Sequence, residues 1–490
     1  MELINSYAQL NSSFFERALP KDVKNPTLIL WNDSLAEELN LPAELIRDRE
    51  KLAQIFSGNE LYPGFDPIAL TYAGHQFGNF VPQLGDGRAH LLCEIRDSNG
   101  NGRDIQLKGS GQTRFSRNGD GLCALGPALR EFIMSESMFY LGIPTARSLA
   151  VVGTGETVFR EGQKPGAVVT RAASSHLRVG TFEYFSARQD RNSLEILLNY
   201  TIQRHYPEIT EENIHEKSIL LLESVINRQI FLISEWMRVG FIHGVMNTDN
   251  TALSGETIDF GPCAMMNQYN PDTVFSSIDH AGRYSFGNQP KILQWNMARF
   301  AETLLLLIDE NPDSAIQKAL PFIQKIPEKF DAEWLNMMRR KIGISIPANK
   351  DDELIHSLLN LMEKNKSDYT NTFDLLTRIM ENQDREYASE EQLNAVGILD
   401  WRDPWQSRLK QENNSDLKIA DLMRKHNPRI IPRNHRVEEA IEEAENTGRF
   451  EKTERLIEVL RSPNRISDQN ETYREPPPDG DQNYMTFCGT

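Results

Sequence analysis

The residues best suited to chemistry lie near the middle of the chain. The sequence His243-Gly244-Val245-Met246-Asn247-Thr248-Asp249-Asn250 is followed by Ile258-Asp259-Phe260-Gly261. Enzymes that act on ATP commonly use an Asn and a later Asp as oxygen ligands for a Mg²⁺ ion that bridges the triphosphate. Asn250 and Asp259 are nine residues apart, with a Ser254-Gly255 turn between them. The spacing therefore predicts that both side chains reach one metal ion.

The same segment has the order of a protein-kinase catalytic loop but lacks the usual base. Kinases place an Asp two residues after the His, followed by four residues and an Asn. Val245 occupies that Asp position, and a valine side chain cannot accept a proton from a substrate hydroxyl. An acid is present instead at Asp249, next to Asn250. The pattern predicts a kinase-like active site in which any base acts from a shifted position.

Positive charge for the phosphates is expected from a strand and a helix upstream. Lys108 follows a predicted strand at 104–107, and Glu131 lies 23 residues further on, in a predicted helix at 127–140. In kinases a strand Lys contacts the phosphates and a helix Glu holds that Lys in place. An isolated Lys and Glu are more often solvated surface residues. Their order relative to the loop nevertheless favours a Lys108–Glu131 pair in a nucleotide pocket.

Two glycine-rich loops and two arginines complete the candidate pocket. Gly85-Asp86-Gly87-Arg88 and residues 109–121 can present backbone N–H groups to phosphate, although neither has the G-x-G-x-x-G pattern of protein kinases. Arg171 and Arg178 flank Ser174-Ser175-His176, after a predicted buried strand. From these residues alone, the loops can equally be surface turns and the arginines can equally form salt bridges between domains. Both alternatives stay open at this point.

Hydrophobic periodicity and turn residues predict the elements that hold these residues. Strands at 89–95 and 103–107 flank an Asn/Gly turn and are expected to form a hairpin. A further buried strand is expected at 167–170, a long apolar helix at 217–239, and a short hairpin around Ser254-Gly255. The candidate catalytic loop would thus follow the end of the apolar helix.

The C-terminal part of the chain has a different character. From about residue 295 to 460 the pattern is largely helical, with a charged helix near Val437 to Arg461. Residues 463–490 include Pro476-Pro477-Pro478 and many polar side chains, which is typical of a mobile tail.

Composition narrows the class of protein. The chain has 490 residues and a formal net charge of −17, which argues against gripping nucleic acid over the whole surface, because phosphate binding needs a basic footprint. No long apolar stretch or targeting segment is present, so we expect no membrane association and a cytoplasmic location. The four cysteines are too few and too scattered for a disulfide framework or a zinc site; they are Cys93, Cys123, Cys263 and Cys488.

Several stretches together resemble one family, selenoprotein O and its bacterial YdiU relatives. They run in order from about residue 70 to 300 and are more specific than any generic kinase motif. The matching stretches are Leu107-Lys108-Gly109-Ser110-Gly111, Arg130-Glu131-Phe132, Leu141-Gly142-Ile143-Pro144-Thr145, Ser175-His176-Leu177-Arg178-Val179-Gly180, 243–250, 258–262, Gly282-Arg283-Tyr284 and Asn288-Gln289-Pro290.

The kinase-like pattern and the resemblance together imply the fold class. We expect an α+β chain with a protein-kinase-like two-lobed fold and an additional helical C-terminal region. Residues 1–165 would form the N-lobe with the nucleotide-binding loops, and 166–430 the C-lobe with the catalytic loop and metal site. Residues 431–490 would form a C-terminal helix and a mobile tail that ends near Cys488.

The resemblance also implies an activity. The family binds ATP in a flipped orientation and transfers AMP to Ser, Thr or Tyr hydroxyls of proteins, releasing pyrophosphate. UTP is left open as a second nucleotide donor. We expect the chain to be a monomer. The resemblance implies these roles by position. Lys108, Arg171 and Arg178 would bind the outer phosphates, and Glu131 would pair with Lys108. Asn250 and Asp259 would bind Mg²⁺ or Mn²⁺, and Asp249 would accept the proton. The nucleotide pocket would be completed by Gly85, Gly87, Arg88, Asp120 and Gly121.

Two other functions fit the same residues. The chain could be an ordinary kinase in which Asp249 replaces the lost base, or a non-catalytic nucleotide-binding scaffold that recruits partners. The complete set of Lys108, Glu131, Asn250 and Asp259 argues against the scaffold, which has no need of a metal site.

The tail cysteine has an open role. Relatives that contain selenium carry selenocysteine near the C-terminus, where Cys488 stands here. Some relatives pair a tail cysteine with another near the activation segment, but Phe275 occupies that partner position and Cys263 is the conceivable substitute. A redox role and an inert thiol both remain open for Cys488.

Overall fold

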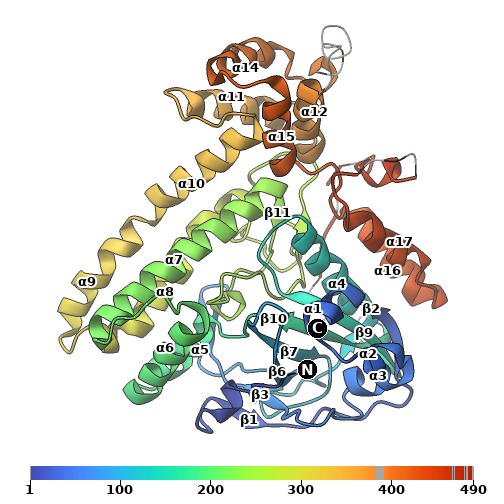
Figure 1. The fold of residues 1–490 in the computed structure, drawn as a ribbon, viewed down its shortest axis with the longest axis vertical. Helices are drawn as coiled ribbons and strands as arrows, with labels where there is room; N and C mark the ends of the chain where they lie inside the picture. Colours follow the sequence, from blue (N-terminus) through green and yellow to red (C-terminus); the bar gives the residue numbers. More distant parts are fainter. Residues whose placement is uncertain are drawn as a thin grey trace.

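The computed structural model describes residues 2–160, 162–381, 391, 393–465, 467, 469–478, 480–481 and 484–487. Strands predominate up to residue 173 and helices beyond it, so the sheet lies on one side of the molecule and the long helices on the other (Figure 1). The predicted mixed fold with a helical C-terminal region is confirmed. Cys488 lies outside the described residues.

An eight-stranded sheet forms the N-terminal half. Its order is β1-β3-β6-β7-β10-β9-β2, with β8 paired to β10, and the pairs are antiparallel. The predicted hairpin is β6 and β7, paired from Ala89 opposite Lys108 to Arg96 opposite Gly102 with one register shift between Leu91 and Cys93. The strands are β1 Phe15–Arg17, β2 Thr27–Trp31, β3 Ile68–Leu70, β6 Ala89–Arg96, β7 Gly102–Lys108, β8 Cys123–Ala124, β9 Arg147–Phe159 and β10 Gln163–Ala173.

Helices cover both faces of this sheet, and strand alternation decides which side chain meets which helix. Leu107 and Val168 pack in the cluster that includes the helices α1 Asp33–Glu38, α2 Ala43–Arg47 and α3 Arg49–Ser57. Val169 packs on the opposite face, against α4 Leu125–Tyr140. Lys108 follows Leu107 and pairs with Val169, so its side chain lies on the α4 face. The predicted helix at 127–140 is confirmed and extends two residues further toward the N-terminus.

The second half is built around one long helix, α7 Ile214–Val239, which confirms the predicted apolar helix. Asn213 caps its start by accepting backbone N–H groups of His215 and Glu216, and Gly240 ends it at a φ of 78°. Helices α8 and α10 pack along it (Figure 1). The neighbouring helices are α5 Val179–Ser186, α6 Arg191–His205, α8 Gln289–Ile308, α9 Pro312–Gln324 and α10 Ile326–Lys341.

The chain after α7 presents the candidate catalytic loop. Strand β11 Phe241–Ile242 pairs antiparallel with β12 Ala264–Met265, so the ends of residues 243–263 are held together. The expected hairpin around Ser254-Gly255 is wrong. Ala252 bridges Arg178 and Thr257 bridges Thr145, so both sides of the turn find partners in other segments and do not pair with each other.

The C-terminal region is helical as predicted, with one correction. The expected charged helix near 437–461 is two helices, because Gly448 takes a φ of 69° and ends the first of them. Both helices pack against α4 (Figure 1). The helices of this region are α11 Asp351–Lys364, α12 Tyr369–Glu381, α14 Arg402–Leu409, α15 Asp416–His426, α16 Asn434–Thr447 and α17 Glu451–Leu460.

The described residues of the expected mobile tail lie against the body of the protein. The backbone N–H of Thr486 donates to the carbonyl of Phe275 at 2.7 Å, and its hydroxyl donates to Pro262 at 2.7 Å. The Tyr484 hydroxyl bonds Glu438 at 2.7 Å. Polar composition predicted mobility here, but these polar groups have specific partners that a single sequence does not reveal.

None of the described helices combines the length and apolar character that a bilayer crossing requires.

Candidate active site

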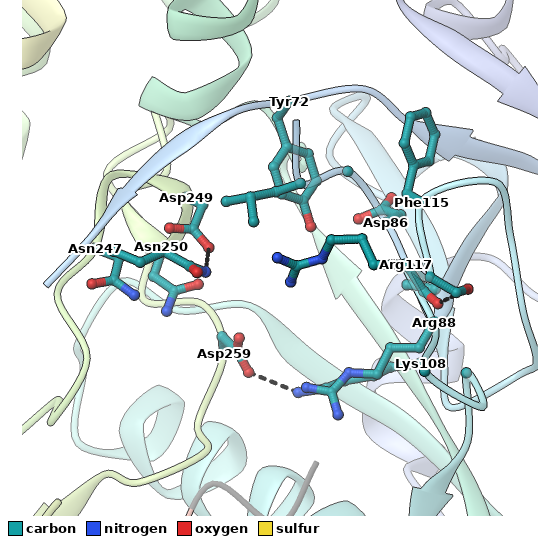
Figure 2. Close-up of a pocket in the computed structure, with 18 of the residues that line it drawn as sticks. Tyr72, Asp86, Arg88, Lys108, Phe115, Arg117, Asn247, Asp249, Asn250 and Asp259 are labelled. Carbon is teal, nitrogen blue, oxygen red and sulfur yellow. Dashed lines mark hydrogen bonds and ion pairs between the residues drawn. The ribbon is translucent and has the colours of Figure 1, made fainter. Parts of the chain in front are cut away.

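A cavity of about 360 Å³ lies between the glycine-rich loops of the sheet and residues 245–259. Figure 2 shows Asn247, Asp249 and Asn250 along one wall and Arg88, Lys108 and Arg117 across from them. Of the twelve residues predicted for the site, eleven line this cavity: Gly85, Gly87, Arg88, Lys108, Asp120, Gly121, Arg171, Arg178, Asp249, Asn250 and Asp259. Glu131 is the exception and lies buried behind the cavity wall.

Four charged side chains form a cluster at the cavity, in which Lys108, Glu131 and Arg171 are buried and the Asp259 side chain is 30% exposed. Lys108 Nζ lies 2.8 Å from Glu131 Oε2 and 2.7 Å from Asp259 Oδ1. Arg171 pairs with Glu131 and, at 3.3 Å, with Asp259. The cluster joins β7, α4, β10 and the loop before β12. The sequence left two alternatives for Arg171, phosphate binding and salt bridges. The structure shows the salt bridges, and Arg171 also lines the cavity.

The charges of this cluster fix its protonation. Burial disfavours the ionised form of Asp259, but the nearby charges of Lys108, Arg171 and Arg88 outweigh it and hold the pKa of Asp259 well below its usual range. The pKa of Glu131 is likewise lowered, since Arg171 and Lys108 overcome its burial. Both carboxylates are ionised at neutral pH, so the cluster carries two positive and two negative charges.

Asp249 lies in a short 3₁₀ turn, η2 Thr248–Asn250, and has one uncommitted oxygen. Its Oδ2 accepts a hydrogen bond from Gln76 Nε2 at 3.1 Å, while its Oδ1 is buried with no partner among the described residues. Arg178 donates to the Asp249 backbone carbonyl at 2.9 Å. Burial raises the pKa of Asp249 to about 6, against the hydrogen bond from Gln76 and the charge of Arg178. Such a carboxylate can accept a proton near neutral pH.

A small hairpin that was not predicted holds this turn. It consists of β4 Gly74–Gln76 and β5 Asn79–Val81. The backbone N–H of His75 donates to Thr248 Oγ1 at 2.7 Å, and that of Phe77 donates to Asn247 Oδ1 at 3.0 Å. From the other side, Glu183 on α5 accepts a hydrogen bond from Thr248 at 2.6 Å. The loop that carries Asp249 is therefore fixed by elements far apart in the sequence.

Asn250 and Asp259 offer oxygen ligands of the kind that Mg²⁺ and Mn²⁺ prefer. The Asn250 amide nitrogen donates to the Val245 carbonyl at 3.1 Å, which leaves the amide oxygen for a ligand. Asp259 has a φ of 62°, so its backbone departs from the common regions where its carboxylate enters the cavity. Among the described residues, no group of three or more His, Cys, Asp and Glu side chains could hold a metal. The donor set therefore fits a metal whose remaining ligands come from phosphate and water.

The predicted glycines are required by close packing of the two loops. Gly85 has a φ of 73°, and a Cβ built on it would lie 2.3 Å from Phe115 Cγ. Gly121 has a φ of 70°, and its Cβ would lie 2.2 Å from the carbonyl carbon of Gly111. Asp120 is bound by Arg160 at 2.8 Å. The loops thus line a cavity, and the alternative that they are free surface turns does not hold.

Sequence reasoning missed several residues of the cavity. Tyr72 packs its ring under the Arg178 guanidinium at 4.3 Å, and Gln76 holds Asp249. Neither belongs to a motif, so no local signal could have found them. The others include Asp86, Phe115 and Arg117, which flank or lie within the loops that were singled out, and Asn247, which lies inside the catalytic loop (Figure 2).

The chain is similar to known proteins over its whole length. The family described as "Protein adenylyltransferase SelO" matches residues 1–461. A protein from Teredinibacter turnerae, named protein nucleotidyltransferase YdiU, is 48% identical over 490 residues, covering 100% of both chains. Proteins of the same name from Geobacillus kaustophilus and Rhizobium rhizogenes are each 50% identical and cover 99% of this chain, with 98% and 96% of their own length matched.

We expect Gly85→Ala to destabilise the protein by about 1–3 kcal/mol more than Gly100→Ala. Both glycines have positive φ, so both substitutions strain the backbone, but the space around Gly100 is open while a Cβ at Gly85 meets Phe115. Urea unfolding of the two variants measures the difference. Equal loss of stability in both would contradict the packing of the two loops described above.

Proposed function

The chain belongs to the SelO family of protein adenylyltransferases, so it is an enzyme that transfers AMP to proteins, and on that premise we propose how its cavity performs the transfer. ATP is the donor, and a Ser, Thr or Tyr hydroxyl of the acceptor protein attacks the α-phosphorus. The new bond is between that oxygen and phosphorus, and the bond to the bridging oxygen of pyrophosphate breaks. Pyrophosphate leaves with the displaced electron pair.

The uncommitted Oδ1 of Asp249 is the observation that carries this proposal. It is a buried acceptor on a side chain that lines the same cavity as Asn250 and Asp259. In the proposed reaction the Asp249 carboxylate, which has a hydrogen-bonding site free on Oδ1, accepts the proton of the attacking hydroxyl, while Gln76 orients it through Oδ2. A base beside Asn250 and Asp259, which would hold the metal, suits attack at the α-phosphorus, because the base and those residues would then act on the same part of the nucleotide.

The positive side chains of the cavity support an inverted nucleotide. Arg171 and Arg178 are buried cations that line the cavity beside Lys108, where an inverted nucleotide would place its outer phosphates. Buried cations stabilise phosphate oxygens, because little water screens them. We assign these three residues, with Arg88, to the outer phosphates and to the charge that develops on pyrophosphate. Gly85, Gly87, Asp120 and Gly121 complete the pocket.

Asn250 and Asp259 are the proposed ligands of a Mg²⁺ or Mn²⁺ ion. When bound, such an ion acts as a Lewis acid on the phosphate oxygens. Asp259 now pairs with Lys108 and Arg171, so its carboxylate is kept ionised and ready for a cation. Glu131 keeps Lys108 in place from behind.

The arrangement around the cavity supports a kinase-like two-lobed fold. A strand Lys pairs with a helix Glu, and a loop after a long helix precedes an Asp-Phe-Gly segment, in the order that kinases use. We propose the N-lobe at 1–165, the C-lobe at 166–430 and the C-terminal region at 431–490. One chain supplies every residue assigned here, which agrees with a monomer, and the scattered cysteines agree with the cytoplasm.

ATP labelled separately on the α- and γ-phosphates tests the reaction. We expect label in protein from the α position only, since the bond broken lies between the α- and β-phosphates. Label from the γ position only would show an ordinary kinase. Nucleotide binding with no label from either position, across acceptors that include the chain itself and a cell lysate, would favour the scaffold.

Asp249→Asn is expected to lower the rate of AMP transfer by ~10²–10⁴-fold, because the amide cannot accept the proton. ATP affinity should change little, as the phosphate-binding side chains are untouched; calorimetric titration measures it. Asp313→Asn on the exposed start of α9 is the matched control and should retain the wild-type rate. A wild-type rate in Asp249→Asn would remove Asp249 from its proposed role.

A further inference from the structure

The segment Gly282-Arg283-Tyr284 has no role in the reaction proposed above, yet it lies beside the catalytic loop. The Tyr284 hydroxyl donates to Asn247 Oδ1 at 2.6 Å, and its ring contacts the ring of Phe77 with centroids 5.1 Å apart. Asn247 stands two residues before Asp249. Arg283 is therefore held at the edge of the active site through its neighbour.

The Arg283 guanidinium hydrogen-bonds the Tyr284 side chain and has no carboxylate partner among the described residues. It lies at the tip of the β4–β5 hairpin, where a Cβ built on Gly78 would be 3.7 Å from its Cζ. It also lies over the ring of Trp295, 4.8 Å from the centroid. Its Nε is buried with no hydrogen-bond partner in the described part of the chain, and no ion pair to a described carboxylate forms. The nearest acid in sequence, Asp279, is occupied by the backbone N–H groups of Arg283 and Tyr284.

A neighbouring arginine shows the contrast. Arg299 lies over the same Trp295 ring at 5.2 Å, but its guanidinium pairs with Glu302 at 2.6 Å. A partly desolvated guanidinium without a carboxylate is costly, and a planar one held by stacking loses little freedom when a carboxylate arrives. Arg283 is therefore suited to bind a carboxylate from another protein.

One hairpin, β4–β5, contacts both the Asp249 region and Arg283. Gln76 bonds Asp249, Phe77 bonds Asn247, and Gly78 meets Arg283, all on the one hairpin. Phe80 on the same hairpin is 41% exposed and has its ring 5.0 Å from that of His75. A polypeptide that brings a hydroxyl to Asp249 from the hairpin side must pass over these residues.

We propose that Arg283 pairs with an Asp or Glu side chain of the acceptor protein close to the target hydroxyl, and that Phe80 supplies an apolar contact beside it. This inference rests on the proposed function and adds the class of acceptor. The formal charge of −17 makes the chain as a whole repel acidic segments, so a local cation at the acceptor side selects where such a segment can bind.

Three synthetic peptides test the inference. They share one central tyrosine and differ only in flanking Glu, Gln or Lys residues. Binding is measured by fluorescence anisotropy with a non-hydrolysable ATP analogue and Mg²⁺, and AMP transfer by incorporation of α-label. We expect the wild-type protein to favour the Glu peptide over the Gln peptide by about tenfold, as one charge-assisted pair provides.

Variants of Arg283 test whether this residue causes the preference for the Glu peptide. In Arg283→Gln the Glu and Gln peptides should bind within about twofold of each other, and Arg283→Glu should favour the Lys peptide. Affinity for the nucleotide should stay at the wild-type value, because Arg283 does not line the nucleotide cavity. Arg455→Gln, which removes a half-buried arginine of α17 that pairs with Glu458, should keep the wild-type preference. Thermal melting confirms that each variant is folded.

The outcomes separate this inference from the proposed function. Equal binding of the Glu and Gln peptides by the wild-type protein, or an unchanged Glu preference in Arg283→Glu, overturns the role of Arg283 even if AMP is transferred. A preference that follows Arg283 while label enters only from the γ-phosphate supports the acceptor surface and overturns AMP transfer.

Discussion

The ion-pair cluster of Lys108, Glu131, Arg171 and Asp259, in which three of the four side chains are buried, is the interaction on which the rest of the site depends. Taking charges out of water is costly unless each is paired, and removing one partner from such a cluster typically costs about 3–5 kcal/mol. Here each cation contacts both carboxylates, so the strand β7, the helix α4, the strand β10 and the loop before β12 are joined at one point. Because the cluster has two cations and two carboxylates, Lys108 and Arg171 can bind the triphosphate while Asp259 binds a divalent metal ion.

The hairpin β4–β5 holds the loop that carries Asp249, on the opposite wall of the cavity. It comes from the N-terminal half, yet its backbone N–H groups hold Asn247 and Thr248, and its Gln76 holds Asp249. Gly180 permits this approach, because a Cβ there would lie 2.1 Å from the carbonyl oxygen of Ala73. One wall therefore fixes the proposed phosphate sites and the other fixes the base. The proposed acceptor surface continues from the hairpin toward Arg283.

Short-range patterns predicted the parts of the site that one strand, one helix or one loop determines. Lys108 and Glu131 were found because β7 and α4 are separated by only a loop and the short strand β8, and Asn250 and Asp259 because one loop carries both. Gln76, Tyr72 and Arg283 were not assigned, since they meet the catalytic loop only through tertiary packing. The hairpin at Ser254-Gly255 failed for the same reason: its flanks bridge Arg178 and Thr145. Gly448 could have predicted the end of a helix, but the continuous run of charged residues on both sides of it favoured a single helix.

The central claim is that the α-phosphate of an inverted nucleotide lies beside Asp249 and the proposed metal ligands. A crystal structure with a non-hydrolysable ATP analogue and Mn²⁺ tests it most directly. The account predicts a metal bound by Asn250 and Asp259 at the α-phosphate, with the outer phosphates on Lys108, Arg171 and Arg178. Adenine deep in the cavity, with the γ-phosphate at the metal, would contradict it.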